Sequence, residues 1–371
     1  MTEELAISTL RYARRNATSR AQWTRLDEAA VRELWDRAVA DHTSAAPEGI
    51  ALAAVGSLGR ADAGPESDLD LVLLHDGGKH PELTGGLGSF ADALWYPIWD
   101  ANLELDHSVR SLDDCRHVAR SDLSAGLAML DLRYIAGDQS LVDEAISAIL
   151  TDWRRAARLR FTALVEDQVE RRRRVGRLPY LIEGDIKEAA GGLRDALLIK
   201  AIVASWLAER PGVDYERSYE FLLDVRDALT RVSQRHNNVL RLQYQDDVAA
   251  ALGFTGTSGA DPADELLAAI SDAARTIRAA YADTVRRARQ HMTTASRGLR
   301  PRFIRGRVVP PHLDEIAPGV GERAGELVLT ESANPADPRV LFRIASAAAL
   351  RDIPIRPDTL RHLRSSGAGT A

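Results

Sequence analysis

Two short apolar runs, residues 50–55 and 69–74, flank a polar segment, and this arrangement constrains the fold more than any other feature of the chain. The first run leads directly into a Gly-Ser-Leu-Gly turn at residues 56–59, and the second begins immediately after Asp68. Short apolar runs bounded by turn-forming residues are typical of β-strands. The sequence therefore predicts two neighbouring strands joined by a loop that contains both glycines and carboxylates.

Asp68 and Asp70 lie two positions apart at the start of the second strand. Successive strand residues alternate between two faces, so both carboxylates are expected on one side, with Leu69, Leu71 and Leu73 toward the core. Two carboxylates on one face raise each other's pKa unless a cation lies between them. Because Mg²⁺ prefers oxygen ligands, the pair is a candidate magnesium site, with Mn²⁺ as the alternative ion.

The glycine turn is a candidate binding site for phosphate oxygens. Gly56 and Gly59 leave backbone N–H groups uncovered at the end of a strand, and a helix that begins there would add its positive end. The Ser57 hydroxyl can donate another hydrogen bond. Arg60 either reaches a phosphate group or pairs with one of the acids that follow it, and the sequence leaves both interpretations open.

A third carboxylate is expected on another strand. Residues 102–110 alternate between polar and apolar side chains, which is typical of a strand with one buried face. Glu104 and Asp106 share the polar face, and either can complete the group, whereas His107 is expected to pack on the apolar face. Two-metal catalysis uses such carboxylates to hold a triphosphate, to activate the attacking hydroxyl and to stabilise the leaving pyrophosphate.

The composition is that of a soluble globular protein with about two domains. The chain has 371 residues, of which 45% are hydrophobic and 27% are charged. A net charge of −6 argues against a general nucleic-acid-binding protein. Cys115 is the only cysteine, which excludes an internal disulfide and a cysteine zinc cluster. The N-terminus lacks a signal-peptide core and no run reaches the roughly 18 apolar residues of a membrane span, so we expect a cytoplasmic protein without a membrane partner.

The fold class is predicted to be α+β, with a small mixed β-sheet domain flanked by helices and followed by an all-α domain. The regions are N-terminal helices at 1–45, the sheet domain at 46–150, a helical domain at 151–295, and a linker with helices at 296–371. Helical spacing is found at 112–137, 153–175, 193–208, 215–236, 263–291 and 338–364. The arginine run 171–174 is predicted to be a solvated helix face.

The glycine turn, the Asp-x-Asp pair and a third acid resemble the DNA polymerase beta-type nucleotidyltransferases. Residues 99–111 and 185–195 are similar to stretches of the uridylyltransferase/uridylyl-removing enzymes of bacterial nitrogen signalling, and so is the helix at 221–234. This likeness covers most of residues 50–295. Ala189 and Ala190 depart from the family's usual Gly-Pro.

The resemblance implies transfer of a nucleoside monophosphate from UTP or ATP to a tyrosine of the PII signalling protein. It implies that Lys187 and Arg194 line the nucleotide cleft. Asp106 stands where many members have glycine, while Glu104 matches some of them. Asp106 is slightly favoured as the third acid because it would lie nearer the end of the strand.

Two other interpretations remain open: a nucleotidyltransferase with a different acceptor, and a regulatory nucleotide-binding module without activity. The Ala- and Arg-rich composition indicates an actinobacterial source, where ATP is the expected donor. The family's hydrolase domain and its glutamine-sensing domains have no counterpart in the motifs found here. We therefore expect a piece of a longer protein that lacks nucleotide removal and glutamine sensing.

Overall fold

The structure is a computed structural model. It describes residues 6–43, 47–256, 259, 261–297, 303–304, 307–308, 314–323, 326–351 and 353–367. The chain divides into two compact units, Met1–His291 and Met292–Ala371, which are described separately.

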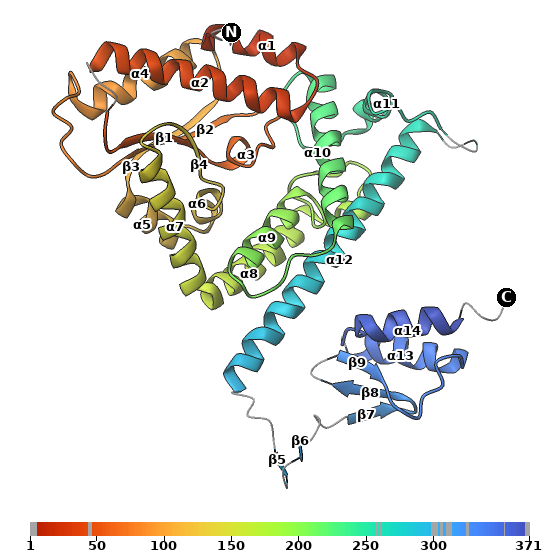
Figure 1. Cartoon of the computed structure of the whole chain (residues 1–371). Coiled ribbons are helices and arrows are strands. Elements are labelled where there is room, and N and C mark those ends of the chain that lie inside the picture. The colour runs from red at the N-terminus through yellow and green to blue at the C-terminus, as the bar shows by residue number, and fades with distance from the viewer. Residues whose placement is uncertain are drawn as a thin grey trace. The chain divides into compact units, whose positions relative to one another are not determined.

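The first unit contains a four-stranded mixed sheet with the strand order β3-β2-β1-β4 (Figure 1). Strand β2 pairs antiparallel with β1 and parallel with β3, and β1 pairs antiparallel with β4. This confirms the predicted mixed sheet and the predicted neighbouring strands. The strands are β1 (Ile50–Ala54), β2 (Leu69–His75), β3 (Leu105–Ser111) and β4 (Arg133–Gly137).

Strand β4 corrects the prediction of helical spacing through residue 137. Its five residues include a short apolar run that carries no periodicity of its own, so a sequence pattern does not separate strand from helix there. The polar-apolar alternation at 102–110 predicted a strand that begins too early. Strand β3 begins only at Leu105, and Asn102 has a positive φ of 54°, which is not strand backbone.

Helices cover both faces of the sheet and continue as a helical region. The helices are α1 (Ile7–Asn16), α2 (Arg20–His42), α3 (Gly56–Gly59), α4 (Gly86–Asp100), α5 (Leu112–Ser121), α6 (Leu123–Met129), α7 (Gln139–Arg155), α8 (Ala157–Val175), α9 (Leu193–Ala204), α10 (Val213–Ser233), α11 (Leu242–Ala251) and α12 (Pro262–Arg297). Helix α12 continues past the boundary of the first unit. The predicted helices at 193–208, 215–236 and 263–291 are confirmed, and the Asp261 side chain accepts a hydrogen bond from the Ala263 amide at the start of α12.

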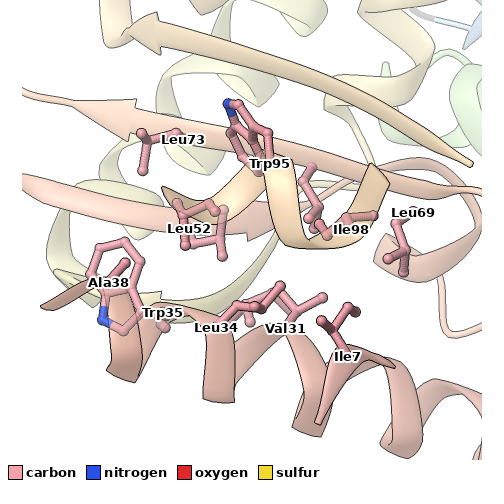
Figure 2. Packing of buried hydrophobic residues seen from close by; sticks show 14 of the residues in the cluster. Ile7, Val31, Leu34, Trp35, Ala38, Leu52, Leu69, Leu73, Trp95 and Ile98 are labelled. Atoms are coloured by element: carbon pink, nitrogen blue, oxygen red, sulfur yellow. The ribbon is translucent and has the colours of Figure 1, made fainter. Parts of the chain in front are cut away.

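Strand β2 is buried on both faces, which fixes the position of the residues at its beginning. Leu69, Leu71 and Leu73 pack into a core with α1, α2 and α4, as Figure 2 shows for Leu69 and Leu73. Val72 and Leu74 pack on the other face with residues of α5 and α7. The predicted inward direction of the three leucines is therefore confirmed.

The second unit contains a three-stranded antiparallel sheet, β7 (Asp314–Ala317), β8 (Val320–Arg323) and β9 (Glu326–Leu329). Helices α13 (Pro338–Arg351) and α14 (Pro357–Gly367) pack on it, and a short pair, β5 (Phe303–Ile304) and β6 (Arg307–Val308), precedes it. The helix pair was predicted. The prediction that residues 296–371 contain only a linker and helices was wrong, because the three strands lie there. Strands of four residues that mix apolar and charged side chains carry too little alternation to be detected. Among the helices that the structure describes, none combines the length and apolar character needed to cross a membrane.

Candidate active site

The pairing of β2 with β3 brings the predicted carboxylates together. Asp70 of β2 lies directly opposite Asp106 of β3, and Asp68 immediately precedes β2. Burial and the nearby charges of Asp68 and Asp106 raise the pKa of Asp70 to about 6. The negative charges of these carboxylates repel one another, and a bound divalent cation relieves that repulsion.

Asp106 rather than Glu104 is the acid that faces Asp70. Glu104 precedes β3, and its backbone carbonyl accepts a hydrogen bond from the Leu69 amide at 2.9 Å. Glu104 is therefore two residues away from the register position opposite Asp70. The register favours Asp106 as the third acid, because opposite residues of paired strands lie on the same face.

The glycine turn lies directly against Asp70. Helix α3 begins at Gly56, and a backbone hydrogen bond from Ser57 lowers the pKa of Asp70 against the larger effects that raise it. Gly56 has a φ of +57°, and a Cβ atom there would overlap the Oδ2 of Asp70. A Cβ at Gly59 would overlap the backbone oxygen of Asp131, so Gly59 is required for close packing of two chain segments.

We predict that Gly56→Ala lowers the rate of the nucleotidyl transfer implied by the sequence resemblance about 100-fold, because displacing a reacting group by about 1 Å has an effect of that size. The added methyl group strains a backbone with positive φ and displaces the Asp70 carboxylate. Steady-state kinetics of Gly56→Ala and Gly88→Ala provide the measurement, since a Cβ at Gly88 meets no atom within 4 Å. Equal rates for both variants would contradict the tight contact between Gly56 and Asp70.

Arg60 pairs with carboxylates of the protein. Its Nε lies 2.8 Å from Asp62 and its Nη1 lies 2.6 Å from Asp131. Its positive charge still lowers the pKa of Asp70, although burial and the two neighbouring acids outweigh this effect. Of the interpretations that the sequence left open, the structure shows pairing with Asp62, and it adds Asp131 as a second partner.

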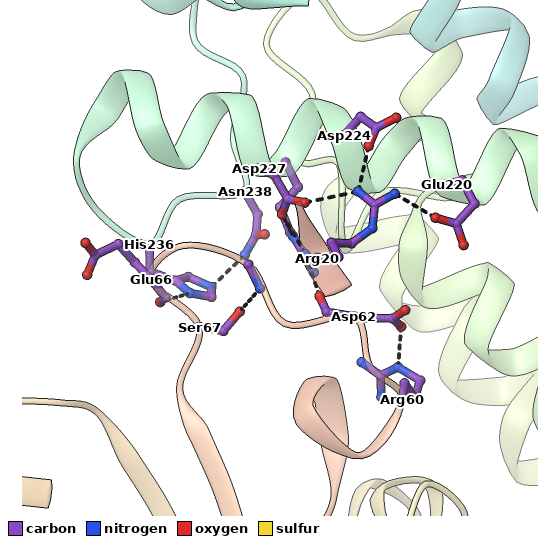
Figure 3. Close-up of polar contacts among 12 residues, drawn as sticks. Arg20, Arg60, Asp62, Glu66, Ser67, Glu220, Asp224, Asp227, His236 and Asn238 are labelled. Carbon is purple, nitrogen blue, oxygen red and sulfur yellow. Dashed lines mark hydrogen bonds and ion pairs between the residues drawn. The ribbon is translucent and has the colours of Figure 1, made fainter. Parts of the chain in front are cut away.

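The loop 60–67, between the glycine turn and Asp68, is held by helix α10 (Figure 3). The Tyr219 hydroxyl donates a hydrogen bond to the Asp62 carboxylate, and Arg226 donates to the Asp62 backbone oxygen at 2.7 Å. Arg226 also pairs with Asp227, which in turn pairs with Arg20 of α2. The helical region and the N-terminal helices therefore both position the loop that leads to Asp68.

Two nucleotide contacts were predicted near α9. Lys187 lies in the loop before this helix, and Arg194 lies in its first turn. The Lys187 amide donates to the Asp185 carboxylate at 2.9 Å, and Arg194 lies 3.5 Å from the Ser124 hydroxyl of α6. Among the hydrogen bonds and ion pairs of the described residues, neither side chain contacts the three aspartates. Their role in nucleotide binding stays a prediction.

The arginine run 171–174 begins with a buried residue, which corrects the predicted solvated face. Arg171 is 3% exposed and its Nη2 lies 2.7 Å from Asp195, which is fully buried. Asp195 also accepts a hydrogen bond from the Gly191 amide at 2.8 Å. This pair joins α8 to the loop that carries Lys187, so the first arginine of the run has a structural role.

The donor atoms at Asp68, Asp70 and Asp106 fit Mg²⁺ or Mn²⁺ by their chemistry, because both ions prefer carboxylate oxygens. Within the described ranges, no group of three histidine, cysteine or acidic side chains already has the spacing of a metal site.

The mixed sheet, the glycine turn and the opposed aspartates are the features expected of the nucleotidyltransferases that the sequence resembles. The family model 'Putative nucleotidyltransferase DUF294' matches residues 2–95, and the GlnD PII-uridylyltransferase family model matches residues 159–285. Residues 159–285 therefore match the family that the sequence resemblance predicted, the uridylyltransferase/uridylyl-removing enzymes.

Curated relatives from three actinobacteria carry the name bifunctional uridylyltransferase/uridylyl-removing enzyme. The enzyme of Streptomyces coelicolor is 41% identical over 91% of this chain and 40% of the relative. The enzyme of Mycobacterium tuberculosis is 40% identical over 86% of this chain and 38% of the relative, and that of Corynebacterium glutamicum is 36% identical over 84% and 42%. The chain thus spans about 40% of the length of these relatives.

Proposed function

We propose that this chain transfers a nucleoside monophosphate from UTP or ATP to a tyrosine hydroxyl of the PII signalling protein in the cytoplasm and releases pyrophosphate. The observation that carries the proposal is the position of Asp70, opposite Asp106 and against the glycine turn. The name of the related enzymes supports UTP as donor, and the description of the matching family model supports PII as acceptor.

In this proposal the chain's own residues bind and orient the two substrates. The Gly56 backbone and the Ser57 hydroxyl, at the start of α3, hold triphosphate oxygens beside Asp70. Asp106 orients the tyrosine hydroxyl and accepts its proton while the oxygen attacks the α-phosphorus and the bond to the β-phosphate breaks. Asp68, Asp70 and Asp106 would hold Mg²⁺ or Mn²⁺, which stabilises the charge that develops on the phosphates.

Labelling tests the proposal directly. Purified PII is incubated with the protein, Mg²⁺ and either α-labelled UTP or α-labelled ATP, and label on PII and released pyrophosphate are measured. Label from one nucleotide identifies the donor. Absence of label from both would overturn the assignment of acceptor. Nucleotide binding without pyrophosphate release toward any acceptor would instead favour a regulatory module.

The two candidate third acids are distinguished by a matched pair of substitutions. We expect Asp106→Asn to lower the rate about 100-fold or more, because it removes a group that contacts the reacting atoms. Glu104→Gln should change the rate by less than about threefold, since this exposed side chain lies before β3. The rate of labelling at saturating nucleotide provides the comparison. The reverse order of effects would assign the third position to Glu104.

A further inference from the structure

Aromatic and apolar side chains are exposed along one edge of the sheet, next to the carboxylates. Tyr96 and Trp99 of α4 are 57% and 42% exposed, and Val109 of β3 is 41% exposed. The Tyr96 and Trp99 rings lie 5.5 Å apart, and the Trp99 and His107 rings 5.2 Å apart. We call these four residues, Tyr96, Trp99, His107 and Val109, the β3-edge patch. Exposed contiguous apolar groups of this kind mark interaction sites.

Strand β3 is the edge strand of the sheet, and its outer side can pair with another polypeptide. In the parallel ladder, every second residue of β3 directs its N–H and C=O groups toward β2. The series starts at Glu104, whose carbonyl accepts a hydrogen bond from the Leu69 amide. The peptide groups of His107 and Val109 therefore point away from β2, toward the outer side.

A strand added at this edge would contact both faces of the sheet. Its side chains would alternate between the face of Asp106 and the face of His107, because successive strand residues point to opposite sides. A tyrosine placed on the Asp106 face would have its two sequence neighbours on the β3-edge patch. The edge thus offers a way to present one side chain to the carboxylates while its neighbours are bound.

The charges around the patch restrict the kind of partner. Asp92 and Asp100 lie four residues before and after Tyr96 on α4, and both are exposed, as are Glu104 and Asp106. These carboxylates repel nucleic acid and anionic membrane surfaces. In a symmetric contact with a second copy of this chain they would face one another, which is also unfavourable. A polypeptide with apolar and basic residues fits the patch.

We propose that the β3-edge patch binds an extended, tyrosine-bearing segment of the acceptor protein as an added strand, with apolar and basic neighbours of the tyrosine on Trp99 and His107. This inference rests on the proposed function for the identity of the acceptor. It assigns acceptor recognition to α4 and β3, separately from the residues that bind nucleotide.

The test uses the whole chain with PII as the probe. Trp99→Ala removes an aromatic contact, and Val109→Pro removes the outward N–H without removing a hydrogen bond to β2. Val109→Ala retains that N–H, and Leu159→Ala on α8 is a control at an apolar residue that is 74% exposed. We expect Trp99→Ala and Val109→Pro to raise the half-saturating PII concentration about tenfold or more. The maximal rate and the half-saturating nucleotide concentration should match those of Leu159→Ala.

Other outcomes would overturn either the docking surface or the proposed function. Unchanged half-saturating PII concentrations for both variants, with active wild-type protein, would overturn the docking surface and leave the proposed function intact. If wild-type protein labels nothing, the proposed function fails, and calorimetric titration of PII then tests the surface directly. Equal PII binding by wild type and Trp99→Ala, or a dimer that Trp99→Ala dissociates in sedimentation, would overturn the inference.

Discussion

Replacing Asp70 with asparagine is expected to slow the proposed nucleotidyl transfer by orders of magnitude while making the metal-free protein more stable. The loss of activity follows from the position of Asp70 opposite Asp106 and against the glycine turn. A carboxylate that binds the metal ion contributes to several kcal/mol of transition-state stabilisation, which corresponds to about 1,000-fold in rate. The substitution keeps the size of the side chain, so the packing of β2 is retained.

The gain in stability follows from the raised pKa of Asp70, which is about 6 in the folded protein. An acid whose pKa is higher in the folded state binds its proton more tightly there, so the metal-free protein loses stability as pH rises from about 4 to about 6. A shift of this size corresponds to about 3 kcal/mol, which solvent screening reduces to about 2 kcal/mol. Asparagine carries no charge and avoids this loss.

Thermal unfolding without divalent ions provides the measurement. The melting temperature of Asp70→Asn should exceed that of wild type by a few degrees at pH 7 and should equal it at pH 4. Added Mg²⁺ should stabilise wild type more than the variant, because ion binding to the folded state raises stability. Asp113→Asn is the control, since that carboxylate is 93% exposed. A variant that retains activity, or that melts below wild type at pH 7, would contradict this account of Asp70.

The sequence was most informative where the chemistry depends on residues close together in the chain. The spacing of Asp68 and Asp70 and the glycine turn at residue 56 are local patterns, and the strand on each side was predicted from a short apolar run. Asp106 was a candidate from alternation, but its choice over Glu104 depends on the β2–β3 register. Register is set by tertiary packing, which a single strand does not encode.

Contacts between distant segments were not predictable in the same way. Asp131 lies 71 positions from its partner Arg60, and Tyr219 lies 157 positions from Asp62. Their side chains are unremarkable in sequence, and only the folded arrangement of α10 beside the loop 60–67 assigns them a role. The motif containing Arg226 and Asp227 was recognised by resemblance, whereas its hydrogen bonds to Asp62 and Arg20 required the structure.

The arginine run at 171–174 also has a local pattern that was recognised in the sequence and a distant contact that was not. Four successive arginines at the end of α8 suggest a solvated face, yet helical spacing turns one of them toward the core. Arg171 meets Asp195, 24 positions further along, and both side chains are almost completely buried. The aspartate of the Leu-Arg-Asp sequence that carries the family resemblance is thus a structural anchor for the loop containing Lys187.

Arg171→Leu is expected to destabilise the protein by about 3–5 kcal/mol, because it leaves the Asp195 carboxylate buried without its cation. Arg173→Leu, an exposed arginine of the same run, should change the free energy of unfolding by less than about 0.5 kcal/mol. Adding Asp195→Asn to Arg171→Leu should recover part of the loss, because the unpaired charge is then removed. Urea unfolding monitored by circular dichroism measures all three variants. Equal stabilities for Arg171→Leu and Arg173→Leu, or a double variant less stable than Arg171→Leu, would show that the pair does not hold this loop.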